Sequence, residues 1–169
     1  MVLQTNRLIL REFKPGDLEY LGSILVNPQV MKFSSSGPCS IEEAQIRLEK
    51  FIESYQIFGF GKWAVCLRGS NQLIGYCGIA MEKIDGKDEK ELGYRLDSQY
   101  WGQGLATEAA SATVKYGFEA LNLPYILGVV ERSNQASVRV LEKVGMKYER
   151  VTIFQGSEMD VYRITSSEL

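Results

Sequence analysis

Two glycines stand in a short polar segment directly before a predicted helix. They are Gly102 and Gly104 in the stretch YWGQGLATEA, residues 100–109. Glycine adopts backbone conformations that other residues avoid, and the first N–H groups of a helix have no partner within that helix. Such N–H groups, together with the helix dipole, favour an anionic ligand. The segment therefore predicts an anion-binding loop, with a tight turn that binds nothing as the alternative.

Two common phosphate-binding motifs do not fit this loop. A P-loop requires Gly-Lys followed by Ser or Thr, and this sequence is absent. A dinucleotide-binding fingerprint requires a third small residue where Thr107 stands. It also requires an acidic residue after a second strand, and none follows at the right place.

The reactive side chains narrow the chemistry further. The chain has no histidine, which excludes a histidine-based triad or a histidine metal site. Any general base must then be a carboxylate, another side chain or water. The three cysteines, Cys39, Cys66 and Cys77, are far apart and odd in number. Neither a disulfide framework nor a zinc site is expected, and a reducing cytoplasm is the default location.

Length and composition predict a single domain over residues 1–169, because 45% hydrophobic residues suffice for one core. The net charge of −2 and the pI near 5.4 give no basic face for nucleic acid. No apolar run approaches the ~20 residues that span a bilayer. The N-terminal stretch alternates and carries Arg7 and Arg11, so it does not resemble a signal peptide.

The spacing of hydrophobic residues predicts a mixed order of strands and helices. Capping signals mark helix ends at Ser40 with Glu43 and at Gly145. The stretch DGKDE, residues 85–89, is expected to be a polar loop. The expected strands are 7–13, 62–68, 72–81, 90–97, 124–131, 147–154 and 158–164. The expected helices run from the KPGD turn to about 26, from 41 to about 55, from about 107 to 121, and from 134 to 144. This order predicts an α/β fold, a mixed sheet with helices on its faces.

Three separated motifs resemble the GNAT superfamily of acetyl-CoA-dependent N-acetyltransferases. They are RLILREF near the start, ELGYRLDSQYWGQGLATEA, and NQASVRVLEKVGM, and the resemblance runs from Thr5 to about Ile164. Within this superfamily, the chain most resembles the branch that holds the ribosomal-protein N-terminal alanine and serine acetyltransferases. The resemblance implies the GNAT fold, a single twisted mixed sheet of about seven strands with helices on both faces. Parallel strands 90–97 and 124–131 would splay apart, with acetyl-CoA in the gap.

The same resemblance implies which residues hold acetyl-CoA. The pyrophosphate would lie on the amides of loop 102–107, and the pantetheine arm would pair with the backbone of residues 95–97. Asn134 would hydrogen-bond that arm, or only cap its helix. Trp101 replaces the Arg or Gln of the family motif and is expected to pack instead. The implied cofactor-binding residues are Arg95, Leu96, Asp97, Gly102, Gln103, Gly104, Leu105, Ala106, Thr107 and Asn134. No metal is expected.

The resemblance implies direct attack by an amine, so the cysteines are expected to be core residues rather than nucleophiles. Glu91 aligns with the strand glutamate that acts as base in the histone-acetyltransferase branch. By alternation it shares a face with Gly93 and Arg95, and the alternative is a surface glutamate paired with Arg95 or a lysine. Glu149 is a weaker candidate. The glutamate of the ribosomal-protein enzymes falls at Gln155–Gly156 and does not carry over.

The leaving thiolate needs a proton. Many members of the superfamily use a tyrosine where this chain has Leu141. The related ribosomal-protein enzymes use a serine one turn earlier, which Ser137 matches, and water is the alternative acid. The backbone N–H near Leu96 would stabilise the oxyanion.

The acceptor is predicted to be a primary amine, foremost a protein N-terminal α-amine. An α-amine, with a pKa of about 8, loses its proton more readily than a lysine amine with a pKa of about 10.4, so it needs a weaker base. The stretches FSSSGPCS (33–40) and FGFGKW (58–63) and the last strands near Tyr162 are expected to line its site. Two alternatives stay open: a small-molecule amine (polyamine, amino acid, antibiotic or toxin) and a non-catalytic acyl-CoA-binding sensor. A homodimer is compatible with the family, in which dimers are frequent.

Overall fold

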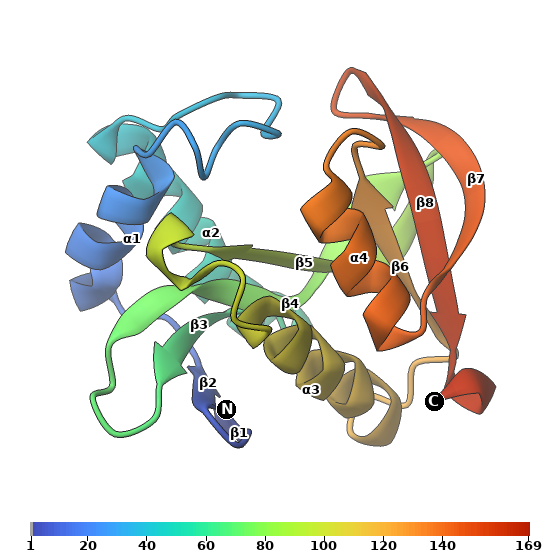
Figure 1. Cartoon of the computed structure of the whole chain (residues 1–169), viewed down its shortest axis with the longest axis horizontal. Helices are drawn as coiled ribbons and strands as arrows, with labels where there is room; N and C mark the ends of the chain where they lie inside the picture. Colours follow the sequence, from blue (N-terminus) through green and yellow to red (C-terminus); the bar gives the residue numbers. More distant parts are fainter. Residues whose placement is uncertain (1) are drawn as a thin grey trace.

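The computed structural model describes residues 2–169. One sheet of eight strands runs through it in the order β1-β2-β3-β4-β5-β6-β8-β7 (Figure 1). The strands are β1 Val2–Gln4, β2 Leu8–Arg11, β3 Lys62–Leu67, β4 Leu73–Ile84, β5 Lys87–Leu96, β6 Tyr125–Val130, β7 Lys147–Phe154 and β8 Ser157–Thr165. The helices are α1 Leu18–Leu25, α2 Ile41–Phe58, α3 Leu105–Glu119 and α4 Gln135–Val144, with short 3₁₀ turns at Pro15–Asp17, Ser98–Tyr100 and Ser166–Glu168.

The expected mixed sheet and its splayed parallel pair are confirmed. Strands β5 and β6 are parallel and pair only at Glu91 with Leu127, whereas the other neighbouring strands are antiparallel. Beyond this pair the two strands diverge (Figure 1). Their carboxyl ends therefore leave unpaired backbone on both sides of a gap.

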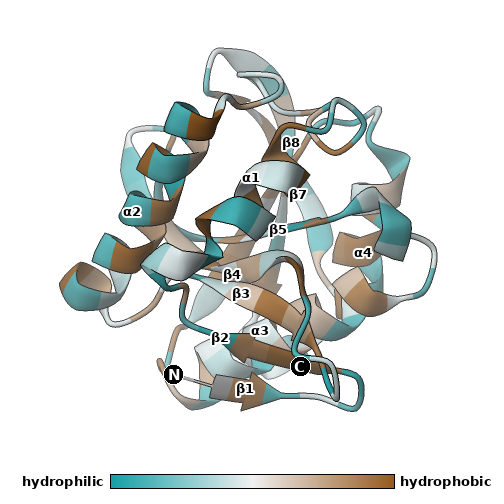
Figure 2. Cartoon of the chain, turned by 90° about the vertical axis from the view of Figure 1, so that its left-hand side faces the viewer, coloured by the Kyte–Doolittle hydropathy of each residue, from teal (hydrophilic) through white to brown (hydrophobic). Residues whose placement is uncertain are grey.

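Two hydrophobic layers hold the sheet between its helices. One cluster joins α1 and α2 to one face through Leu21, Leu25 and Leu48. The larger cluster joins α3 and α4 to the other face through Val114, Leu141 and neighbouring strand residues. Figure 2 shows hydrophobic residues along β3 in the middle of the sheet, and hydrophilic and hydrophobic residues together along α2. Alternate residues of β5 therefore face different layers.

The predicted helix-end signals are confirmed. The Ser40 hydroxyl accepts from the Glu43 N–H at 3.2 Å, and the Glu43 carboxylate accepts from the Ser40 N–H at 2.8 Å, which starts α2. Gly145 ends α4 in the left-handed region at φ +101°. Helix α3 begins at Leu105, two residues before the expected start.

The expected polar loop at residues 85–89 is wrong. Strands β4 and β5 continue as one long hairpin up to Ile84 and Lys87. The turn is Asp85-Gly86, with φ +51° and +76°, which are the dihedral signs of a two-residue turn that matches strand twist. The polar residues of this stretch favour a loop, but its Asp-Gly pair is a signal for a two-residue hairpin turn. The other difference is an eighth strand, β1, which pairs with β2 at the edge of the sheet.

Candidate active site

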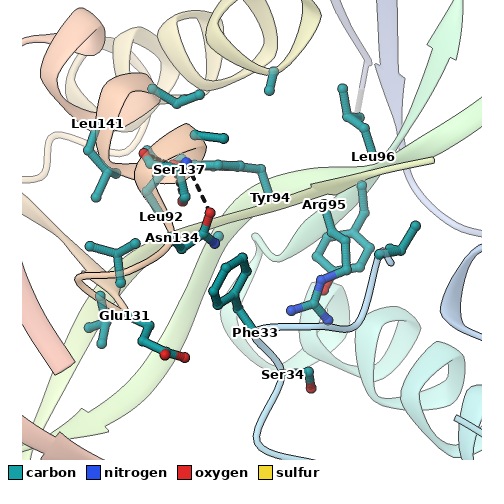
Figure 3. A pocket seen from close by; sticks show the side chains of 18 of the residues that line it. Phe33, Ser34, Leu92, Tyr94, Arg95, Leu96, Glu131, Asn134, Ser137 and Leu141 are labelled. Carbon is teal, nitrogen blue, oxygen red and sulfur yellow. Dashed lines mark hydrogen bonds between the residues drawn. The ribbon is translucent and has the colours of Figure 1, made fainter. Parts of the chain in front are cut away.

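A cleft of about 1010 Å³ opens where β5 and β6 diverge. Its walls come from the loop at 29–36, from α2, from the segment 100–107 and from α4, with the β7–β8 turn at one end. Strand β5 crosses the cleft, and its side chains alternate between two sides. Figure 3 shows Tyr94 directed toward Ser137 and Asn134, and Arg95 directed toward Phe33 and Ser34. The cleft therefore has two halves, one beside α4 and one beside α2.

The predicted anion-binding loop has the expected backbone. Gly102 and Gly104 have φ of +73° and +76°, the left-handed region in which other residues are strained. Gly104 caps α3 without any side-chain hydrogen bond. Within residues 2–169, no protein group accepts a hydrogen bond from the backbone N–H groups of 102–107. This loop can therefore donate several N–H groups to an anion such as a pyrophosphate.

The N-terminal segment fixes this loop in place. The Arg7 guanidinium donates to Glu108 Oε2 at 2.6 Å and to the Gln103 carbonyl at 2.9 Å. The Glu108 carboxylate also accepts from the Arg7 N–H at 2.8 Å and from the Thr5 hydroxyl at 2.6 Å. The loop is thus tied to the turn between β1 and β2 by charge-assisted bonds rather than left free.

The backbone at the end of β5 is only partly available. The Asp97 N–H donates to the Ile74 carbonyl at 2.8 Å, and by ladder alternation Arg95 also faces β4. Only Leu96 of the expected trio turns its backbone toward the gap. Its carbonyl accepts from the indole N–H of half-exposed Trp101 at 2.9 Å, so Trp101 braces the strand end. The Leu96 N–H remains available to a ligand.

Glu91 lies buried on the half of the cleft beside α2. Its carboxylate Oε2 is 3.5 Å from Lys62 Nζ, and the two side chains are 9% and 16% exposed. Burial raises the pKa of Glu91 to about 7, while the Lys62 ammonium and the Val129 N–H oppose that rise. A Cβ on Gly93 would lie 2.1 Å from Lys62 Nζ. Glycine at 93 therefore gives the ammonium room beside Glu91, and a carboxylate with a pKa near neutrality can exchange protons.

Tyr94 and Ser137 form a hydroxyl pair on the half beside α4. The Tyr94 hydroxyl lies 2.8 Å from Ser137 Oγ and donates to the Ser137 carbonyl at 2.9 Å. Asn134 Oδ1 accepts from the Ser137 N–H at 3.3 Å and caps α4 (Figure 3). Burial raises the pKa of Tyr94, so its hydroxyl keeps its proton at neutral pH. Sequence reasoning missed Tyr94, although alternation already put it on the face opposite Glu91.

Several predicted residues do not join the cleft. Glu149 lies on β7 with Arg150 and Arg163 and lines a separate hollow. Tyr162 is buried against Tyr148, and of FGFGKW only Lys62 lines the cleft. The cysteines are buried and unpaired in the core, as expected.

Two loops border the other end of the cleft. Of the stretch 33–40 that was expected to line the acceptor site, only residues 33–36 line this end, together with Phe154, Gln155 and Met159 of the β7–β8 hairpin. The Ser35 hydroxyl donates to Gln155 Oε1 at 3.2 Å, which links the two loops. In the part of the chain described here, no group of three or more His, Cys, Asp or Glu side chains is placed to hold a metal ion. Over the same residues, no helix has the length and apolarity to cross a membrane.

A family model described as an acetyltransferase (GNAT) domain matches residues 7–147. Among curated proteins, the chain is 34% identical over 152 residues to the uncharacterised N-acetyltransferase YoaA of Bacillus subtilis. That match covers 89% of this chain and 85% of YoaA.

Solved structures share the whole fold. The crystal structure of a GNAT-family acetyltransferase from Bacillus anthracis superposes with a TM-score of 0.85 at 29% identity, covering 99% of this chain and 100% of the other. The ribosomal L7/L12 α-N-protein acetyltransferase RimL in complex with coenzyme A superposes with a TM-score of 0.81 at 20% identity. That match covers 98% of each chain.

Proposed function

The chain belongs to the GNAT family of acetyltransferases, and on this premise we propose that it transfers an acetyl group directly from acetyl-CoA to an α-amine. The observation that carries the proposal is a buried carboxylate on one side of β5 and a hydroxyl pair on the other, with the free N–H groups of 102–107 beside them. The foremost acceptor is the α-amine of a protein N-terminus.

Glu91 is the proposed general base. The attacking amine must be neutral, and the bond from its nitrogen to the acetyl carbon releases a proton. A carboxylate with a pKa of about 7 is about half ionised at neutral pH and accepts that proton directly or through one water. An α-amine with a pKa near ~8 is a closer match to this base than a lysine amine.

The hydroxyl pair is proposed to return a proton to sulfur. As the carbon–sulfur bond breaks, the coenzyme A thiolate takes a proton from Ser137, whose hydroxyl lies 2.8 Å from that of Tyr94. Tyr94 can turn its single proton from the Ser137 carbonyl to Ser137 Oγ, which supports the serine while it loses its own proton. The products are the acetylated amine and the free thiol of coenzyme A.

The remaining groups are proposed to bind and polarise the thioester. The amides of 102–107 would hold the pyrophosphate, as the bare N–H groups of this loop favour. The Leu96 N–H would donate to the carbonyl oxygen as negative charge develops there, and the side-chain amide of Asn134 would donate to the pantetheine arm. The backbone groups of Arg95 and Asp97 face β4, so of these three residues only Leu96 is proposed to pair with the pantetheine arm through its backbone.

A small-molecule amine is the second candidate acceptor. The contact between Ser35 and Gln155 links the loops at the end of the cleft, and a cleft narrowed there admits a small amine more readily than a folded N-terminus. Direct competition between the two acceptor classes therefore decides between them.

The test is thiol release from acetyl-CoA with purified protein. Peptides beginning with Ala or Ser are compared with a panel of small amines, in the wild type and in Glu91→Gln. Glu149→Gln is the matched control, because Glu149 lies outside the cleft. Turnover that depends on an α-amine and is lost in Glu91→Gln alone supports the proposal. Tight acetyl-CoA binding with no turnover for any amine contradicts it and favours a non-catalytic acyl-CoA sensor.

A further inference from the structure

The half of the cleft beside α2 has an excess of positive charge. It is floored by Tyr76 of β4, and its charged lining residues are Lys32, Arg47, Lys50, Lys62 and Arg95 against Glu82 and Glu91. A substrate amine must approach Glu91 through this half. The electrostatic potential there favours the neutral form of an amine and opposes a second ammonium group.

Most of this positive charge has no carboxylate partner. Lys62 lies beside Glu91. Throughout residues 2–169, no Asp or Glu oxygen comes within 4.0 Å of Arg47, Lys50 or Arg95. The Arg95 guanidinium donates to the sulfur of Met31 at 3.1 Å. A thioether is a weak acceptor, so the guanidinium keeps most of its capacity to bind an anion.

The hydroxyl of Tyr76, a largely buried residue, lies among these cations and is accessible from the cleft. Tyr76 is 5% exposed and lines the cleft, and its hydroxyl has no hydrogen-bond partner in the described chain. Lys62 Nζ lies 5.7 Å from the centre of its ring, and Arg95 is its direct neighbour across the β4–β5 ladder. Burial would raise the pKa of Tyr76, but Arg95, Lys62 and Arg47 outweigh burial and lower it.

We propose that the acceptor carries a carboxylate a few bonds from its amine, bound by the Arg95 guanidinium and the Tyr76 hydroxyl beside Arg47. This inference rests on the proposed function, because it places the amine at Glu91. The Cα atoms of Glu91 and Arg95 are four strand residues apart, or about 13 Å. The side chains of Glu91 and Arg95, together with an extended acceptor and one water between them, can bridge that distance. The carboxylate belongs either to a free amino acid or to an acidic side chain at a peptide N-terminus.

The test compares acceptors that carry or lack a carboxylate near the amine. Free glutamate and aspartate are assayed against their diamides, C-terminally amidated dipeptides with Asp or Glu at the first or second position against those with Asn or Gln, and spermidine against both. We expect kcat/KM to be at least about tenfold higher for the carboxylate member of each pair, with spermidine poorest. The amino-acid and peptide arms show which source of carboxylate the cleft takes.

Variants connect that preference to the named groups. Arg95→Gln and Tyr76→Phe are expected to raise KM for carboxylate acceptors by about tenfold or more, whereas KM for the neutral members of each pair should change much less. Lys115→Gln, an exposed change on α3, is the control. Equal kcat/KM for charged and neutral members, a preference for spermidine, or an equal loss for all acceptors in Arg95→Gln would overturn the inference.

A binding measurement separates this inference from the proposed function. N-acetylglutamate and its diamide cannot accept an acetyl group, and their binding is measured by calorimetry in the wild type and in Arg95→Gln. Carboxylate-dependent binding without turnover keeps the carboxylate site and refutes the acetyl transfer. Turnover of amines without carboxylate-dependent binding keeps the acetyl transfer and refutes the site.

Discussion

Replacing Lys62 by Met should move the pH dependence of acetyl transfer toward alkaline pH. Lys62 Nζ lies 3.5 Å from Glu91 Oε2, and both side chains are largely buried. The ammonium favours the ionised carboxylate, so it holds the pKa of Glu91 below the value that burial alone would give. Without this charge, the protonated form of Glu91 becomes more stable, and the rising limb of the rate must occur at higher pH.

The distance sets the magnitude. Two unit charges 3.5 Å apart interact by about 5 kcal/mol at an effective dielectric constant of about 20, which is equivalent to a pKa change of roughly 3. Water entering beside a shorter apolar side chain reduces this effect, so we expect the pKa of Glu91 to rise from about 7 to about 8 or higher. At pH 7 the ionised fraction then falls from about one half to about one tenth or less, and kcat falls about fivefold.

The assay is kcat from thiol release at saturating acetyl-CoA and acceptor, from acidic to alkaline pH. Two acceptors whose amines differ in pKa separate titration of the enzyme from titration of the substrate. Lys115→Met controls for the loss of a lysine charge at an exposed site. The role assigned to Lys62 is refuted if kcat rises with pH at the same pH in wild type and Lys62→Met, or if the pH of that rise follows the amine pKa of the acceptor.

Three further changes test the other parts of the site. Glu91→Gln should remove the limb near pH 7 and lower kcat by about 10²- to 10⁴-fold with little change in KM for acetyl-CoA, measured in the same assay; an unchanged kcat would exclude Glu91 as the base. Gly104→Ala places a Cβ at φ +76° in open space apart from Arg7 at 3.5 Å, so backbone strain alone should cost about 1–2 kcal/mol. It should appear as weaker coenzyme A binding by calorimetry and a lower melting temperature, and unchanged affinity would refute a role for this backbone conformation. Tyr94→Phe and Ser137→Ala should each lower kcat, and the double variant should lose little more than the worse single variant, because the two hydroxyls form one bonded unit; additive losses would show that they act independently.

The features that depend on local backbone rules were predictable from the sequence. The left-handed glycines at 102 and 104, the capping box at Ser40 and the C-terminal glycine of α4 follow from residues within a few positions of one another. The Asp85-Gly86 turn belongs to the same class, because Asp-Gly between two alternating strands is itself a hairpin signal. Local rules therefore predict the anion-binding loop and the limits of the helices and strands that carry the site.

The partners of these residues were not predictable in the same way. Alternation places Glu91 and Tyr94 on opposite faces of a strand, but it does not say which helices cover each face. Lys62 reaches Glu91 from β3, across the intervening strand β4, and Ser137 reaches Tyr94 from α4. These contacts depend on strand order and helix packing, which the spacing of residues along the chain does not specify.

Strand β5 explains how one short segment can serve two substrates. Its odd-numbered residues, from Glu91 to Arg95, face α2 and the proposed acceptor, whereas Tyr94 and the Leu96 backbone face the gap and the proposed thioester. A slip of one residue would exchange these faces. The ten-residue ladder with β4 prevents such a slip, and it starts from a turn that fixes the pairing of Ile84 with Lys87. The mispredicted loop is therefore the element that sets the register of the site, and changes at Asp85-Gly86, far from the cleft, should act on both substrates together.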